Sequence, residues 1–194
     1  MKSLQLSSPH MLIVVGIPGS GKSMFADKFS EAFAAPRLSA HVIASNASSE
    51  KSAIILAEHF LNELLKTKQT LIVDGMGSSR VERTDLTRMA RKAGYVVVTV
   101  WVQTDKSTAK ARTTKKSRQA SNPKMSGEEF ERKYKQFTSP NASEKVMVIS
   151  GKHTPATQVK AVLKRLTEPR STISTHSTPP VREAGSSHRS IVVR

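Results

Sequence analysis

The chain has 194 residues, with 31 Lys and Arg against 15 Asp and Glu, a formal net charge of +16 and a sequence pI near 10.4. This length predicts one α/β domain with its own core plus a tail, and excludes two large domains. Cysteine is absent, which excludes disulfides, thiolate zinc sites and cysteine nucleophiles.

The apolar runs of the chain are short. The sustained ones cover residues 11–15, 71–73 and 95–102 and fall well below the roughly 20 residues that a membrane span requires. The N-terminus carries a single Lys2 and no long apolar stretch with a cleavage site, so it is not typical of a signal peptide. We therefore expect no membrane association and a cytoplasmic location.

Strands and helices are predicted to alternate along the first half of the chain. Apolar runs and helical spacing predict a strand over 10–15, a helix over 23–35, a short strand over 41–44 and a helix over 49–66. A strand over 70–73 and a helix over 81–93, stopped by Gly94, follow. The β-branched run 95–102 is the clearest strand, and we expect it to be central in the sheet.

The second half of the chain continues the alternation as far as residue 166, and no periodic pattern follows. The patterns predict a helix from 105 that runs into a segment at 117–124, a helix over 126–137, a strand over 145–149 and a helix over 154–166. Such alternation predicts a mostly parallel sheet of about five strands with helices on both faces. We expect one domain over 1–167, and a disordered Ser/Thr/Pro-rich tail over 168–194.

A glycine-rich loop joins the first predicted strand to the first predicted helix. Its residues match the pattern G-x-x-x-x-G-K-[ST] in full: Gly16, Ile17, Pro18, Gly19, Ser20, Gly21, Lys22 and Ser23. The backbone N–H groups of such a loop point at phosphate oxygens, and the helix N-terminus adds partial positive charge. Lys22 is expected to reach the β- and γ-phosphates of ATP, and the Ser23 hydroxyl to ligate Mg²⁺. The sequence therefore predicts an α/β P-loop NTPase fold.

A carboxylate follows the strand predicted over 70–73. Asp74 would lie beside the P-loop and hold the metal, directly or through its water, as a Walker B aspartate does. The four-residue pattern is weak alone, since an aspartate can simply cap a strand end, but the P-loop favours the metal role.

Positive charge is concentrated between residues 105 and 135, where ten basic residues stand against four acidic ones. Such a segment favours polyanions, among them nucleic acid. The alternative is that it is only a solvated basic surface.

The chain resembles the polynucleotide-kinase-type P-loop kinases, many of which are described as AAA-family ATPases. The likeness rests on residues 12–29 and 71–102 and on the Lys-Ala-Arg-Thr stretch at 110–113. It implies ATP and Mg²⁺ as cofactors and a basic lid at about 105–124 whose arginines close over the phosphates. In that lid the resemblance assigns Arg112 and, as weaker candidates, Lys116 and Arg118.

One departure from this family concerns the acceptor site. After the second strand these kinases carry Asp-x-x-Arg, whereas the stretch that we align with it offers Asn46 and Ser49. An amide is not a base, and a hydroxyl cannot make the bidentate phosphate contact of a guanidinium. Among the acids, only Glu50 and Asp74 are expected near a strand end that faces the site. A slow kinase is therefore one prediction.

Two functions remain open on the sequence alone. The first is an ATP-dependent kinase that phosphorylates a hydroxyl, with a nucleic acid or phosphorylated small molecule as acceptor. The second is a nucleotide-binding protein with weak or no transferase activity that binds nucleic acid or protein. A motor or remodelling ATPase is disfavoured, since one small domain leaves little room for the additional elements of such machines.

Overall fold

The computed structural model describes residues 6–114, 125–141, 143–144 and 146–167 of the chain. The predicted tail over 168–194 and the two weaker lid candidates, Lys116 and Arg118, lie outside these residues.

Five strands and seven helices make up the described residues. In chain order they are β1 (His10–Val15), α1 (Lys22–Phe33), β2 (Arg37–Ser39), α2 (Ala40–Asn46), α3 (Glu50–Lys66), β3 (Leu71–Asp74), α4 (Arg80–Lys92), β4 (Val96–Gln103), α5 (Lys106–Thr114), α6 (Gly127–Gln136), β5 (Val146–Ser150) and α7 (Pro155–Thr167).

The strands form one sheet in the order β2-β3-β1-β4-β5, and every neighbouring pair is parallel. β1 is the middle strand and is buried along its whole length, as the continuous apolar run of a parallel strand requires. Its register sets Val14 beside Asp74 on β3 and beside Val100 on β4. The loop that leaves β1 therefore begins next to the acidic end of β3.

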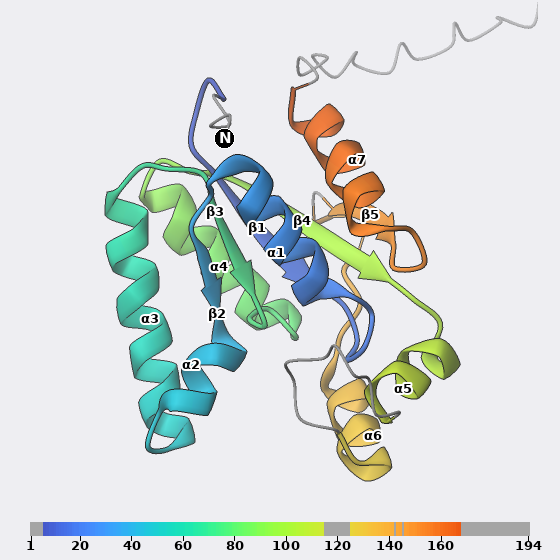
Figure 1. Ribbon diagram of the computed structural model, residues 1–194. Coiled ribbons are helices and arrows are strands. Elements are labelled where there is room, and N and C mark those ends of the chain that lie inside the picture. The colour runs from blue at the N-terminus through green and yellow to red at the C-terminus, as the bar shows by residue number, and fades with distance from the viewer. Residues whose placement is uncertain (1–5, 115–124, 142, 145, 168–194) are drawn as a thin grey trace, which may run out of the picture.

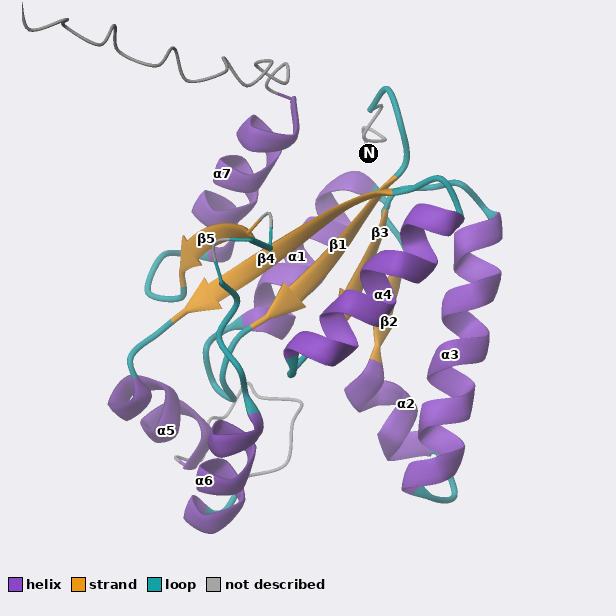
Figure 2. Ribbon diagram, turned by 180° about the vertical axis from the view of Figure 1, so that it is seen from behind, coloured by secondary structure: helices purple, strands orange, loops and turns teal. Residues whose placement is uncertain are grey.

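Helices cover both faces of the sheet. α1 and α7 lie on one face, and α3 and α4 on the other, as the two opposite views show (Figure 1, Figure 2). The first layer packs Phe25, Phe29 and Val162 against β1 and β4, and the second packs Leu61 and Leu86 against β1 and β3. α2, α5 and α6 lie beyond the carboxyl ends of the strands, where open parallel sheets bind their ligands (Figure 1).

The predicted fold class is confirmed, with one element wrong. The run 41–44 is not a strand but lies inside helix α2, and the second strand is the three-residue segment β2 that precedes it. Ser39 ends β2 and also caps α2, because its hydroxyl accepts a hydrogen bond from the Val42 N–H at 3.4 Å. The 95–102 strand is interior, although β1 is the middle strand. Within the described part of the chain, no helix is long and apolar enough to cross a membrane.

Candidate nucleotide-binding site

The P-loop occupies the space between β1 and α1, and neighbouring backbone packs tightly on its glycines. Gly19 has φ +75°, and a Cβ placed on it would lie 2.3 Å from the carbonyl oxygen of Ala109 in α5. A Cβ on Gly16 would lie 2.5 Å from the carbonyl oxygen of Val102 in β4. Real Cβ atoms do not approach oxygen so closely, so this packing requires glycine at both positions.

Lys22 begins α1 and folds back over the loop. Its Nζ donates a hydrogen bond to the carbonyl oxygen of Ile17 at 2.8 Å. Desolvation lowers the pKa of Lys22 to about 8, opposed by the negative charge of Asp74 and assisted by the positive charge of Lys133. Lys22 is therefore close enough to Asp74 to feel its charge, and any anion that enters the loop will favour its protonated form.

Asp74 is the last residue of β3 and is 4% exposed at its side chain. Oδ2 accepts a hydrogen bond from Nη2 of Arg37 at 2.5 Å. Oδ1 is buried and has no hydrogen-bond partner among the described residues, and the same is true of Oγ of Ser20 in the P-loop. Buried polar atoms without partners are uncommon and mark places where a ligand or ion can complete the structure.

These features fit a nucleotide with its magnesium ion. Neighbouring backbone holds Gly16 and Gly19 in place, and a glycine-rich loop at the start of a helix offers its N–H groups to phosphate oxygens. Asp74 supplies one free carboxylate oxygen, and Ser23 lies in the first turn of α1 beside Lys22. Mg²⁺ binds proteins through one or two such oxygens and takes the rest of its ligands from phosphates and water.

α5 and the β5–α7 turn enclose the loop on the β4 side. Arg112 of α5 donates from Nη1 to the carbonyl oxygen of Gly151 at 3.0 Å. Gly151 in turn lies against the P-loop, because a Cβ on it would be 2.2 Å from the carbonyl oxygen of Ser20. Thr104 Oγ1 donates to the same Ser20 oxygen at 3.2 Å. Arg112 is thus placed at the rim of the P-loop by a contact with protein backbone.

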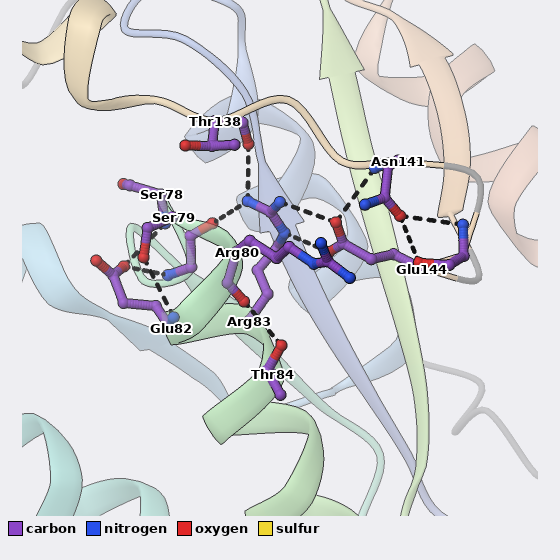
Figure 3. Close-up of polar contacts among 11 residues, drawn as sticks. Ser78, Ser79, Arg80, Glu82, Arg83, Thr84, Thr138, Asn141 and Glu144 are labelled. Carbon is purple, nitrogen blue, oxygen red and sulfur yellow. Dashed lines mark hydrogen bonds and ion pairs between the residues drawn. The ribbon is translucent and has the colours of Figure 1, made fainter.

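A buried arginine organises the loop that follows Asp74 (Figure 3). Arg83 on α4 is 1% exposed, and Nε and Nη2 donate to the two oxygens of Glu144 at 2.6 and 3.0 Å. Its Nη1 donates to the carbonyl oxygens of Gly77 at 3.1 Å and Thr138 at 2.9 Å. Arg83 therefore joins the β3–α4 loop to the segment that leads from α6 to β5, and holds the pKa of Glu144 below its usual range.

Glu82 holds the same part of this loop through backbone N–H groups. Glu82 Oε2 accepts from the backbone N–H groups of Gly77 at 3.0 Å and Ser78 at 2.9 Å. The Ser78 carbonyl oxygen accepts from the Thr138 N–H at 2.9 Å. Every one of these contacts fixes backbone within a few residues of Asp74, so the carboxylate stands on a rigid support.

Part of the basic segment is neutralised within the protein. Lys106 and Lys110 of α5 both pair with Glu131 of α6, at 2.8 and 2.9 Å, and Lys133 pairs with Glu129 at 2.9 Å. A recess of about 920 Å³ lies between the two helices; among its lining residues are Lys110, Glu131, Arg132 and Lys135. Arg132 and Lys135 are exposed, and neither belongs to an ion pair of the described residues, so both are available to a polyanion.

The alignment that placed Asn46 and Ser49 after the second strand is wrong. Asn46 is the exposed last residue of α2, and its side-chain amide donates to the Val42 carbonyl oxygen of its own helix at 2.8 Å. Ser49 is the N-cap of α3 and accepts from the Ser52 N–H at 3.1 Å. Glu50 is the exposed first residue of α3 and does not end a strand. The residues that directly follow β2 are Ala40 and His41.

Sequence reasoning missed three residues at this site: Arg37, Arg83 and Gly151. No local pattern distinguishes Arg37 or Arg83 from the other arginines of a basic chain. Gly151 follows a predicted strand directly, and a glycine at the carboxyl end of a parallel strand was a usable signal of close backbone approach.

The parallel sheet, the strand-loop-helix at Gly16–Ser23 and the buried aspartate on the neighbouring strand define the class of P-loop nucleotide-binding folds. Residues 11–140 match the AAA_33 family, whose description is AAA domain. This match covers more than half of the 194 residues, so the chain belongs to that family. A search of curated protein sequences gives no match.

Solved structures of kinases share this fold. A gluconokinase from Sinorhizobium meliloti 1021 is 16% identical, with a TM-score of 0.61 over 81% of this chain and 91% of its own. The APS kinase CysC of Mycobacterium tuberculosis, in complex with AMPPNP and APS, is 14% identical, with a TM-score of 0.60 over 83% and 99%. Chaetomium thermophilum Kti12, in complex with ADP-AlF3, is 16% identical, with a TM-score of 0.61 over 80% and 96%. These likenesses establish the P-loop kinase fold, whereas the narrower polynucleotide-kinase type is not confirmed.

Proposed function

We propose that this protein is an ATP-dependent phosphotransferase that moves the γ-phosphate of ATP to a hydroxyl. The observation that carries the proposal is the complete P-loop, with Lys22 beside a buried aspartate whose Oδ1 has no partner among the described residues. Among proteins of the same fold, an APS kinase is in complex with AMPPNP and Kti12 is in complex with ADP-AlF3, which supports ATP as the donor.

Each residue of the proposed site has a role that its position supports. The Gly16–Ser23 loop binds the phosphates through its backbone, and Lys22 neutralises the charge that develops on the transferred group. Ser23 and Asp74 hold Mg²⁺, which bridges the phosphates and offsets their charge. Arg112 adds a cation at the rim of the loop, where it would meet the nucleotide after releasing the Gly151 carbonyl.

A binding and transfer experiment tests this function. Wild-type protein should gain thermal stability with Mg·ATP, and Lys22→Ala should lose most of that gain while unfolding at an unchanged temperature without nucleotide. Labelled ATP should then transfer its γ-phosphate to one of several pools: 5′-hydroxyl oligonucleotides, phosphorylated small alcohols, nucleosides or simple sugars. Absence of any nucleotide-dependent shift in the wild type would refute the proposal.

A second candidate function is a nucleotide-binding protein with little transferase activity. It is favoured by the residues after β2, because no Asp or Glu occurs between Arg37 and Glu50. A phosphorylatable hydroxyl bound beside β2 would find no carboxylate among the residues that follow that strand, and Asp74 on the neighbouring strand is assigned to the metal. Loose phosphoryl-transfer transition states depend more on positioning than on a base, so this observation weakens the first proposal without removing it.

For the second candidate, nucleic acid is the partner that the exposed charges of α6 favour. Single-stranded RNA or DNA should bind with an affinity that falls steeply with salt, because phosphate contacts release counterions. The double variant Arg132→Ala with Lys135→Ala should reduce the slope of log affinity against log salt by about 1.4, since each contact with a single strand contributes about 0.7. Lys106→Ala, which removes a lysine already paired with Glu131, serves as the matched control and should change it less.

A further inference from the structure

Arg37 connects the proposed metal-binding carboxylate to the first helix. Nη2 donates to Asp74 Oδ2 at 2.5 Å, and Nη1 donates to Oδ1 of Asp27 on α1. The side chain of Arg37 is 17% exposed and that of Asp74 is 4% exposed, whereas that of Asp27 is 66% exposed. The contact with Asp74 is therefore a largely buried charge pair, and the contact with Asp27 lies at the surface.

The strand register explains how Arg37 reaches this position. Arg37 lies beside Ile72 on β3, and Ser39, two residues further on, lies beside Asp74. Leu38 between them packs into the core layer of α3 and α4, so Arg37 points to the opposite face, where α1 lies. The guanidinium therefore extends along the strand toward the carboxyl edge of the sheet and meets Asp74 from the side of α1.

The two oxygens of Asp74 consequently have different surroundings. Oδ2 is held by a guanidinium, while Oδ1 is buried and unpaired within the described part of the chain. Nε of Arg37 is also buried, and it has no hydrogen-bond acceptor among the described residues. The desolvation free energy of this guanidinium is therefore not fully offset by hydrogen bonds. A guanidinium that is buried at such a cost against the candidate ligand carboxylate suggests a task at the metal site.

We propose that Arg37 is a positioning residue that makes divalent-cation binding at Asp74 depend on nucleotide. Its charge offsets that of Asp74, so a free divalent cation gains little there, while its hydrogen bond orients the carboxylate with Oδ1 free. A cation bound to ATP brings the phosphate charge with it and needs only the one oxygen that Arg37 leaves available. This inference rests on the proposed function, since it assigns Asp74 to the metal.

Electron paramagnetic resonance of Mn²⁺ tests the proposal on the full chain. Free Mn²⁺ is titrated with and without a non-hydrolysable ATP analogue, and the ratio of the two dissociation constants measures the coupling between cation and nucleotide. Without nucleotide, Arg37→Met should bind Mn²⁺ at least about tenfold more tightly than the wild type, because a positive charge next to Asp74 has been removed. The ratio of the two dissociation constants should fall by the same factor. Arg37→Lys, which keeps the charge, should retain the coupling.

Three further variants separate the outcomes. Arg37→Gln keeps an N–H group for Asp74 without the charge, and it decides the matter if Arg37→Met does not fold. Asp27→Asn removes only the surface end of the contact and should leave the coupling within about twofold, since exposed pairs contribute little. Asp74→Asn should lower the coupling clearly, although Ser23 and the phosphates still provide ligands for the cation.

Wild-type coupling in both Arg37→Met and Arg37→Gln overturns the proposal, and so does unchanged coupling in Asp74→Asn. Failure of the wild type to bind nucleotide at all would instead refute the proposed function, and the Lys22→Ala experiment detects that separately.

Discussion

The two sides of the P-loop differ sharply in how firmly they are built. On the β4 side, α5 and the β5–α7 turn pack backbone against Gly19 and Ser20. The segment between α6 and β5 is joined to the β3–α4 loop by the four hydrogen bonds of Arg83. On the β2 side, α2 is a seven-residue helix without a fully buried residue, and Val42 within it is 55% exposed. The donor half of the proposed site is preformed, whereas the acceptor half offers few fixed polar groups.

This contrast bears on how the protein can select its ligands. A phosphate-binding loop that is already ordered loses little conformational entropy when nucleotide binds. The affinity for nucleotide should therefore depend on the P-loop and its β4 side, and not on the β2 side. Acceptor choice must come from groups beside β2 and β3 or from a partner that completes that side. If the difference between the two sides is energetic as well as geometric, substitutions on the β4 side should lower the free energy of unfolding more than substitutions on the β2 side.

The largest effect is expected from Arg83, which supports the firm side. Arg83→Met leaves Glu144 partly buried without its partner and should lower the free energy of unfolding by about 3–5 kcal/mol. Denaturant unfolding measures this. Arg88→Met on the same helix removes an exposed pair with Asp85 and should cost less than about 1 kcal/mol. Equal losses in the two variants would show that the buried network does not stabilise the loop.

The Arg83 effect should also depend on pH in a defined direction. Arg83 lowers the pKa of Glu144 in the folded protein below its unfolded value of about 4.3. The pair therefore contributes its full stability above that value and loses it as pH falls through the folded pKa. The difference in unfolding free energy between wild type and Arg83→Met should accordingly be constant near neutrality and shrink in acid.

A smaller effect is expected from the titration of Lys22. Its pKa is about 8 in the free protein, and bound phosphates must raise it, so ATP binding should take up a proton at and above that pH. Affinity should fall by up to about tenfold per pH unit above about 8. Calorimetry in buffers of different ionisation enthalpy measures the uptake. Lys22→Arg, which stays protonated, should show none, and equal uptake in that variant would assign the proton to another group.

The sequence predicted the firm side well. The P-loop, Asp74 and the position of α5 follow from a glycine pattern and from apolar periodicity, which are local signals. The acceptor side was mispredicted because β2 is only three residues long and begins with an arginine, while the apolar run after it fits a strand or a helix equally. Ser39 is the N-cap of α2, and a serine directly before an apolar run is a local signal that favours a helix there.

Long-range contacts account for what no local pattern could indicate. Arg83 and Glu144 are 61 residues apart, and Arg37 and Asp74 are 37 apart, so each pair exists only once the sheet has formed. In a chain with 31 basic residues, nothing in the sequence distinguishes an arginine that will be buried from one that stays in solvent.

The smallest effect is expected from the two residues first aligned with the acceptor motif. Ser49 caps α3, so Ser49→Arg should cost about 1 kcal/mol of stability, while Asn46→Asp should cost less, since Asn46 is exposed and bonds only within its own helix segment. The double variant should transfer phosphate within about twofold of the wild-type rate, because neither side chain follows the end of β2. Denaturant unfolding and the labelled-ATP assay measure the two quantities on the same preparations. A gain of tenfold or more, the low end for an added general base, would place residue 46 at the acceptor and show that α2 moves toward the P-loop during turnover.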